Sequence, residues 1–135
     1  MIVADTDVLI DFLRGEGSAA DRISLEIERG LSTTAVTAFE LWTGSTGSKR
    51  RETAVNSLLD ALKVLPLDPH SAKAAASIRS ELQSRGRTMG MADALIAGIC
   101  VEQGAILLTR NRRHFEGIER LALGTLADDD AGTQS

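Results

Sequence analysis

Short apolar runs alternate with amphipathic segments along this chain. The apolar runs 2–4, 64–65 and 105–108 predict buried strands, and segments 31–34 and 118–123 are further strand candidates. Between these runs apolar residues recur at helical spacing, which predicts helices over residues 6–13, 19–29, 35–44, 52–62, 69–85 and 91–103. Because strands that alternate with helices favour a parallel sheet covered on both faces, we expect a three-layer α/β/α fold with a short central sheet.

A polar step interrupts the apolar sequence near the N-terminus. Asp5-Thr6-Asp7 follows the first predicted strand, and apolar residues resume at Val8. Asp5 is therefore predicted at the carboxyl end of a strand, the edge where ligands bind in open α/β sheets. Thr6 and Asp7 are candidate N-caps of the next helix, and capping is the preferred interpretation of Asp7 over a chemical role. Capping leaves the charge of Asp5 unexplained.

Two further acids lie in segments expected to be largely buried. Glu40 is the only acid in the predicted helix 35–44, and Asp93 stands near the start of a helix that is apolar nearly all round. Taken alone, Glu40 fits a solvent-facing position and Asp93 fits a helix cap. Together with Asp5 they form a candidate cluster, in which like charges repel unless protons or cations intervene. Hard carboxylate oxygens suit Mg²⁺ or Mn²⁺, which activate water for attack on a phosphodiester.

Composition narrows the class of protein. A chain of 135 residues with 43% hydrophobic and 25% charged residues fits one globular domain. Apolar runs are far shorter than a membrane span, and no basic segment precedes an apolar one at the N-terminus, so we expect a cytoplasmic protein. The one cysteine, Cys100, lies among apolar residues and is interpreted as a buried, inert thiol. No histidine or cysteine pair is spaced to bind zinc.

The net charge of −4 argues against a broad basic surface for nucleic acid. Three local basic clusters remain, at Lys49-Arg50-Arg51, at Arg85 with Arg87, and at Arg110 with Arg112-Arg113. Each cluster alone is typical of a solvated surface. The clusters would contact phosphates only if they converge around a site.

The C-terminal residues differ in composition from the rest. Asp128-Asp129-Asp130 stands in a segment with no large apolar residue after Leu126. We therefore expect residues 1–125 to form the domain and 126–135 to form an acidic, disordered tail.

Four stretches together resemble PIN domains, in particular the toxin ribonucleases of VapBC toxin–antitoxin pairs. They occur in the family's order and spacing over about residues 1–124, and they are Asp5 to Asp11, Thr33-Thr34 through Glu40-Leu41, Asp93 to Ala97, and Leu107 to Phe115. The resemblance implies a compact α/β/α PIN-like fold and the activity of an endoribonuclease that depends on Mg²⁺ or Mn²⁺.

The resemblance also implies roles for individual residues. Asp5, Glu40 and Asp93 would be the three principal metal-binding acids, with Thr6 and Thr109 holding ligands or water through their hydroxyls. The fourth acidic position of the family falls on Asn111, which carries no charge, so a second metal site is in doubt and Asp7 is a candidate replacement. Arg110, Arg112 and Arg113 are candidate RNA contacts, with an exposed turn as the alternative, and His114 is interpreted as structural.

Partners follow from the same resemblance. It implies a homodimer, a cognate VapB-type antitoxin that inserts a segment near the acids, and an RNA substrate cut in a single-stranded loop of tRNA or rRNA. Trp42 is a candidate contact for either protein partner, with core packing as the alternative. Because aromatic content is 3%, we expect phosphate contacts and RNA shape to outweigh base stacking.

Two other functions share some of these features. Asp5-Thr6-Asp7 after an apolar strand resembles the nucleophile motif of haloacid-dehalogenase-like phosphatases, in which Asp5 would attack phosphorus and Asp7 would act as general acid. That enzyme needs a late acidic pair at a strand end, and Asp128-Asp129 in the polar tail fits this poorly. A PIN-like interaction domain, inactive because Asn111 replaces an acid, is the non-enzymatic alternative.

Overall fold

The structure, a computed structural model, describes residues 1–17 and 19–126 of the chain. Over these residues helices alternate with short strands, as the hydrophobic pattern predicts. The elements are β1 (Ile2–Ala4), α1 (Thr6–Arg14), α2 (Ala20–Arg29), β2 (Ser32–Thr34), α3 (Ala35–Ser45), α4 (Lys49–Asp60), β3 (Lys63–Leu65), α5 (Pro69–Ser84), α6 (Met91–Gln103), β4 (Ile106–Leu108), α7 (Arg112–Phe115) and β5 (Ala122–Leu123).

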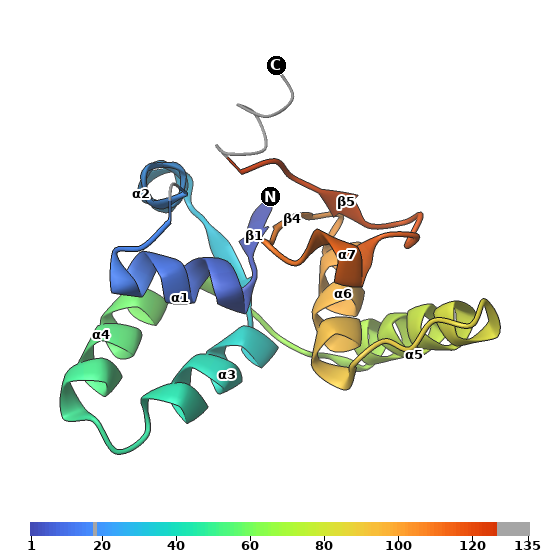
Figure 1. The fold of residues 1–135 in the computed structure, drawn as a ribbon, viewed down its shortest axis with the longest axis horizontal. Coiled ribbons are helices and arrows are strands. Elements are labelled where there is room, and N and C mark those ends of the chain that lie inside the picture. The colour runs from blue at the N-terminus through green and yellow to red at the C-terminus, as the bar shows by residue number, and fades with distance from the viewer. Residues whose placement is uncertain (18, 127–135) are drawn as a thin grey trace.

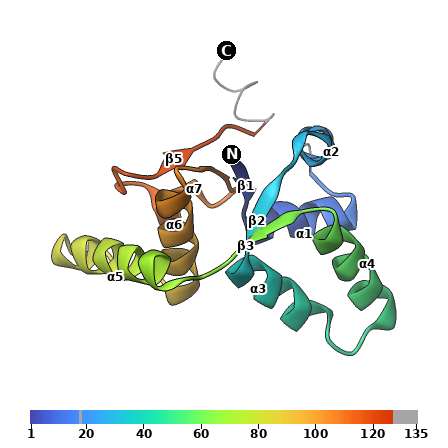
Figure 2. The ribbon, with the colours of Figure 1, turned by 180° about the vertical axis from the view of Figure 1, so that it is seen from behind.

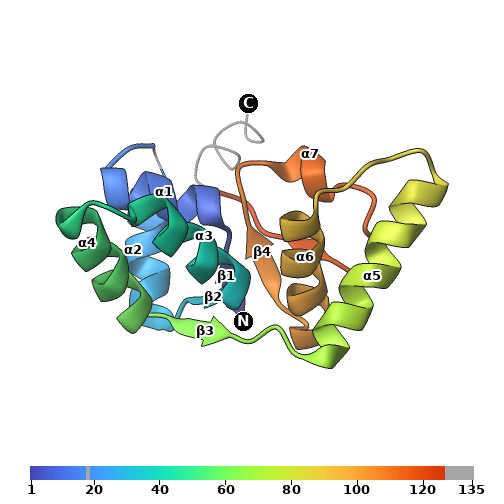
Figure 3. The same cartoon turned by 90° about the horizontal axis from the view of Figure 1, so that it is seen from below.

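The strands form one parallel sheet in the order β3-β2-β1-β4-β5. Figure 1 labels β1, β4 and β5, and Figure 2 shows β1, β2 and β3 from behind. Helices α1 to α4 gather on one side of the sheet, and α5 to α7 gather on the other (Figure 3). The expected three-layer α/β/α arrangement is confirmed.

The sheet is buried on both faces because neighbouring strand residues point in opposite directions. Val3 and Leu107 pack with α5 and α6, whereas Ala4 and Leu108 pack with α1 to α4. Strand β2, between β3 and β1, is polar yet buried, and the Thr33 hydroxyl donates to the Ala4 carbonyl oxygen at 2.8 Å. This bond satisfies a polar side chain that burial would otherwise penalise.

Three boundaries differ from the sequence prediction. Helix α4 begins at Lys49, because the Ser48 hydroxyl accepts the Arg51 N–H and caps it, so the basic run is helical. The short helix α7 replaces a predicted loop, and β5 occupies only the end of the segment 118–123. These are short or polar elements, for which hydrophobic periodicity is a weak guide.

Helix α6 lies directly against α5. Gly98 of α6 is the point of closest approach, since a Cβ added there would stand 2.5 Å from the Ser71 carbonyl oxygen and 2.7 Å from the Ala75 backbone nitrogen. Only glycine permits this approach. The packing fixes the position of α6, and α6 carries Asp93.

The C-terminal prediction is only partly within the described residues. Leu126, which we assigned to the tail, is 6% exposed and packs with the core on the α1–α4 side. The acidic residues after it lie outside the described part of the chain. Among the helices that are described, none is long and apolar enough to cross a membrane.

Candidate active site

The candidate site lies where the order of strands reverses. Strands β1 and β4 are neighbours in the sheet although they are far apart in sequence, and their carboxyl ends meet. Asp5 follows β1 and Thr109 follows β4, and the Asp5 N–H donates to the Leu108 carbonyl oxygen at 2.9 Å. Such a switch point is the usual ligand-binding position in open parallel sheets.

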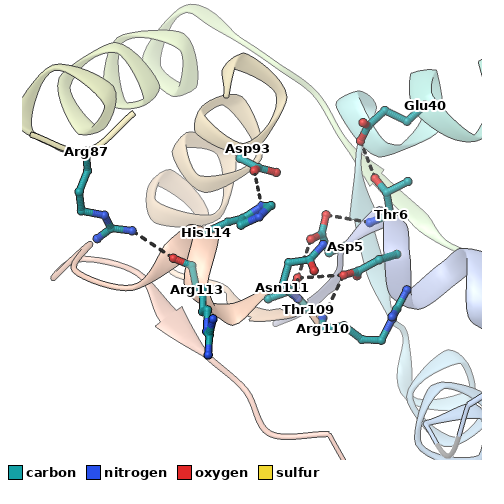
Figure 4. Close-up of polar contacts among 11 residues, drawn as sticks. Asp5, Thr6, Glu40, Arg87, Asp93, Thr109, Arg110, Asn111, Arg113 and His114 are labelled. Atoms are coloured by element: carbon teal, nitrogen blue, oxygen red, sulfur yellow. Dashed lines mark hydrogen bonds and ion pairs between the residues drawn. The ribbon is translucent and has the colours of Figure 1, made fainter. Parts of the chain in front are cut away.

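Asp5 is buried at this junction, with only 5% of its surface exposed. One carboxylate oxygen accepts the Thr6 backbone N–H at 2.8 Å, and the other accepts the Thr109 hydroxyl at 2.7 Å (Figure 4). Asp5 is therefore the N-cap of α1. The prediction that Thr6 or Asp7 caps this helix was wrong.

Burial raises the pKa of Asp5 to about 6, because the ionised form loses its contact with water. The Thr109 hydroxyl and the Thr6 N–H lower this pKa, while the negative charges of Asp7 and Asp93 raise it. Burial likewise raises the pKa of Asp7. The site thus holds more negative charge than its own hydrogen-bond donors compensate, which is the condition that favours a bound cation.

The raised pKa predicts how stability depends on pH without added metal. The folded chain binds a proton at Asp5 with a pKa of about 6, against 3.8 for the free side chain, so stability increases as pH falls from about 6 towards 4. In EDTA buffer, the free energy of unfolding at roughly pH 5 should exceed the value at roughly pH 7.5 by about 1 kcal/mol. Urea unfolding at both pH values measures the difference, and equal or lower stability at the acid pH would contradict the assignment.

Glu40 is linked to the same junction through a chain of threonine hydroxyls. The Thr6 hydroxyl lies 2.6 Å from Glu40 Oε1 and 3.0 Å from Thr37 Oγ1, and Thr37 Oγ1 lies 3.4 Å from Thr34 Oγ1. Thr6 has one hydroxyl hydrogen and a carboxylate only accepts, so Thr6 donates to Glu40 and Thr37 donates to Thr6. Thr37 is a site residue that the sequence reasoning missed, although its place one helical turn before Glu40 was a usable signal.

Asp93 lies on α6 at the other side of Asp5 and contacts α7. The His114 Nδ1 stands 2.9 Å from Asp93 Oδ2, and because a carboxylate only accepts, the imidazole donates. His114, interpreted from the sequence as structural, thus positions a candidate site acid. Helix α7 is tethered in turn by Arg87, which donates to the carbonyl oxygen of Arg113 (Figure 4). Arg87 also donates to the carbonyl oxygen of Glu116.

Asp7 connects α1 to the loop after β4. Its Oδ2 accepts the Arg110 backbone N–H at 3.1 Å, while its Oδ1 is buried without a hydrogen-bond partner in the described part of the chain. Asn111 donates its backbone N–H to the Thr109 hydroxyl at 3.1 Å, and its side chain is exposed. Asp7 therefore orients the loop that carries Thr109, and its second oxygen remains available to a cation or water.

The three principal acids surround one end of the sheet without touching. Thr6 links Asp5 to Glu40, and the charge of Asp93 acts on Asp5. Within residues 1–17 and 19–126, however, no three His, Cys, Asp or Glu side chains lie close enough to hold a metal ion. The sequence predicts a cluster of these acids, and in the structure Thr6 lies between Asp5 and Glu40.

The basic residues near this site are mostly engaged. The Arg110 guanidinium pairs with Asp11 at 2.7 Å, and Arg112 donates to the Gly124 carbonyl oxygen at 2.7 Å. Arg113 is exposed. Arg110 and Arg112 thus use their side chains within the fold, which weakens the prediction that they contact RNA.

Two other sequence interpretations are resolved. Cys100 is fully buried and burial raises the pKa of its thiol to about 12, as expected for an inert cysteine. Trp42 is 51% exposed and its indole N–H donates to Asn56, so the core-packing alternative was wrong. Phe39, on the same helix, is 67% exposed.

Comparison with known proteins relates the chain to one family. The model of the PIN domain matches residues 2–121. The tRNA(fMet)-specific endonuclease VapC of Shigella flexneri is 30% identical over 118 residues, which cover 84% of this chain and 89% of that protein. Ribonuclease VapC10 of Mycobacterium tuberculosis is 34% identical over 122 residues, 90% of each chain.

Solved structures agree with the sequence comparisons. The DNA-bound VapBC of Salmonella typhimurium aligns with a TM-score of 0.82 at 28% identity, covering 91% of this chain and 96% of that chain. The VapBC2 of Rickettsia felis, bound to a promoter DNA fragment, aligns with a TM-score of 0.82 at 22% identity, covering 92% and 98%, and supports the fold alone. These matches favour the PIN interpretation over the haloacid-dehalogenase-like alternative.

Proposed function

The chain belongs to the PIN-domain family, and we propose that it is the toxin of a type II toxin–antitoxin pair, an endoribonuclease that hydrolyses RNA phosphodiester bonds with Mg²⁺ or Mn²⁺. The observation that carries the proposal is Asp5, a buried carboxylate with a raised pKa at the switch point of the sheet. Glu40 and Asp93 flank it from two helices. Capping α1 does not require the negative charge of Asp5, because an uncharged asparagine or serine caps a helix as well.

The carboxylates of the three principal acids are ligands of the kind that a hard divalent cation prefers. Asp5, Glu40 and Asp93 would hold it through carboxylate oxygens, and Glu40 Oε2 and Asp93 Oδ1 accept no hydrogen bond from the described residues. Binding then requires the three carboxylates to approach more closely than the structure shows. When bound, the ion lowers the pKa of a coordinated water and stabilises charge on the phosphodiester oxygens.

The chain's own residues hold these acids ready. Thr6 and Thr109 keep Asp5 oriented, and the hydroxyl chain from Thr34 through Thr37 keeps the Thr6 hydrogen directed at Glu40. His114 orients Asp93 from α7 in the manner of an outer-shell partner. Asn111 adds no charge at the fourth position, so one metal ion is the expected stoichiometry, with Asp7 Oδ1 as the nearby spare ligand.

Partners and location form part of the proposal. The VapBC complexes in the comparisons support a VapB-type antitoxin as partner, and the name of the Shigella flexneri relative supports a tRNA substrate. The exposed Phe39 and Trp42 on α3 support a protein contact there, either the second copy of a homodimer or the antitoxin. We propose a cytoplasmic location, where such RNA is found.

Metal removal tests the proposed activity. Purified chain incubated with structured RNA is expected to cut it in Mg²⁺ or Mn²⁺ and to lose all cleavage in EDTA, because the carboxylates alone do not activate water for this reaction. Gel analysis of the RNA ends measures the result. A small phosphomonoester in the same buffers serves as the comparison substrate. Release of phosphate without RNA cleavage would indicate a phosphatase, and neither reaction would indicate an inactive interaction domain.

A further inference from the structure

A groove between α1, α3 and α4 shares a wall with the candidate active site. The groove is a cavity of about 710 Å³, and Glu40 lies in its lining together with Arg14, Arg50 and Arg51. Arg14 ends α1, and the other two arginines are in the first turn of α4. In Figure 1, α1 lies above α3 and α4, which a loop joins at the bottom of the view. Segments distant in sequence thus bring three arginines to the lining of one groove.

These arginines differ from the basic residues nearer the acids. Arg14, Arg50 and Arg51 are exposed, and no ion pair or side-chain hydrogen bond ties them to any other described residue. Arg110, by contrast, is paired with Asp11. In a chain whose net charge is −4, a groove lined by three arginines and one acid, Glu40, favours an anionic ligand.

We propose that this groove binds the backbone of single-stranded RNA and leads it to Glu40. Phosphates contact the three arginines, and bases lie on the aliphatic floor, which includes Ile10, Leu41 and Val55. The inference rests on the proposed ribonuclease function, because that function makes Glu40 part of the site that the RNA must reach. The main RNA contact is then expected at the start of α4, and not in the segment 110–113 where the sequence predicts it.

Binding without cleavage tests the groove directly. In EDTA buffer, fluorescence anisotropy of a short labelled single-stranded RNA of mixed sequence is measured over a range of KCl concentrations. The variant R14Q/R50Q/R51Q is expected to bind about tenfold or more weakly at low salt, with the slope of log affinity against log salt reduced by about 2. Circular dichroism melting checks that the variant is folded.

A matched variant removes the same charge elsewhere. Lys63, Lys73 and Arg120 are exposed and do not line the groove, and K63Q/K73Q/R120Q is expected to bind RNA within about threefold of the unmodified chain. Equal weakening by both triple variants overturns the proposal, as does unchanged binding by the groove variant. Retained RNA binding with lost antitoxin binding assigns the groove to a protein segment instead.

The outcomes separate the groove from the enzyme activity. If the unmodified chain binds RNA through the groove but does not cut it in Mg²⁺, the groove stands and the ribonuclease proposal fails. If it cuts RNA and the groove variant binds RNA normally, only the groove proposal fails. If it binds no RNA, the groove proposal fails.

A label in the groove gives an independent readout. Gly44 lines the groove, and a Cβ added there meets no atom within 4 Å, so Gly44→Cys is accommodated. Cys100 is buried with a pKa raised to about 12, so it does not react with the label. RNA should change the emission of a fluorophore at position 44 and leave one at Ser80→Cys on α5 unchanged. Equal changes at both positions overturn the proposal.

Discussion

Replacing Asp5 by asparagine is expected to lower the rate of RNA cleavage by roughly a hundredfold or more. The same substitution is expected to make the protein more stable. Activity falls because the amide keeps the shape of the carboxylate but removes the negative charge that would hold the cation. Cleavage rates in Mg²⁺ under single-turnover conditions measure this loss. The pairing of lost activity with gained stability is the specific expectation, since damage to the fold would lower both.

The gain in stability follows from the buried charge. Ionised Asp5 costs about 3 kcal/mol at neutral pH, because its pKa is about 6 in the folded chain and 3.8 when free. Asparagine still accepts the Thr6 N–H, and its amide donates to the Thr109 hydroxyl, which can turn towards Asp7 Oδ2 at 3.5 Å. After an offset of about 1 kcal/mol for rearranged hydrogen bonds, we expect a net gain of about 1–2 kcal/mol in EDTA.

Asp60→Asn is the matched control, because Asp60 is exposed at the end of α4. It removes one negative charge and should change neither cleavage nor stability by much. The Asp5 variant should also lose the pH dependence expected of the unmodified chain between about pH 5 and 7.5. Full cleavage by Asp5→Asn would remove Asp5 from the catalytic site, and a large loss of stability would contradict its buried-charge interpretation.

The fold was predictable wherever burial produces a regular pattern. Strand β4 and helix α6 were predicted correctly because nearly every residue in them is apolar. Strand β2 was only a candidate, since its buried threonines form hydrogen bonds outside the strand, Thr33 to Ala4 of β1 and Thr34 to Thr37 of α3. The start of α4 was missed because its first turns carry no apolar face.

The candidate site was predictable in its acids and not in its supporting residues. Asp5 stood out because a charge beside an apolar strand conflicts with burial, and this conflict is visible in the sequence. The roles of Thr37 and His114 depend on which elements meet in space, as does the pairing of Arg110 with Asp11. A run of basic residues in the sequence shows only that positive side chains are present. The fold determines which of these side chains pair with an acid.

Adding one methyl group at Gly98 is expected to be the most damaging small change to the fold. In Gly98→Ala the new Cβ meets the Ser71 carbonyl oxygen at 2.5 Å, the Ala75 nitrogen at 2.7 Å and the Ala75 Cβ at 2.8 Å. Two of these atoms are helix backbone, so α5 and α6 must separate. Overpacking of this kind costs about 2–3 kcal/mol, which corresponds to a fall in melting temperature of roughly 8–12 °C.

The sign of this effect distinguishes tertiary packing from helix propensity. Alanine is favoured over glycine within a helix by up to about 1 kcal/mol, so Gly44→Ala in α3, where the added Cβ meets no atom within 4 Å, should stabilise the chain or leave it unchanged. The same substitution therefore has opposite effects at two helical positions. Because α6 carries Asp93, Gly98→Ala should also reduce RNA cleavage at temperatures well below its melting point. The melting curve of Gly44→Ala should stay normal. A Gly98→Ala chain that melts within a few degrees of the unmodified one would show that α5 and α6 are less tightly packed than the structure describes, and the position of Asp93 would then need a different support.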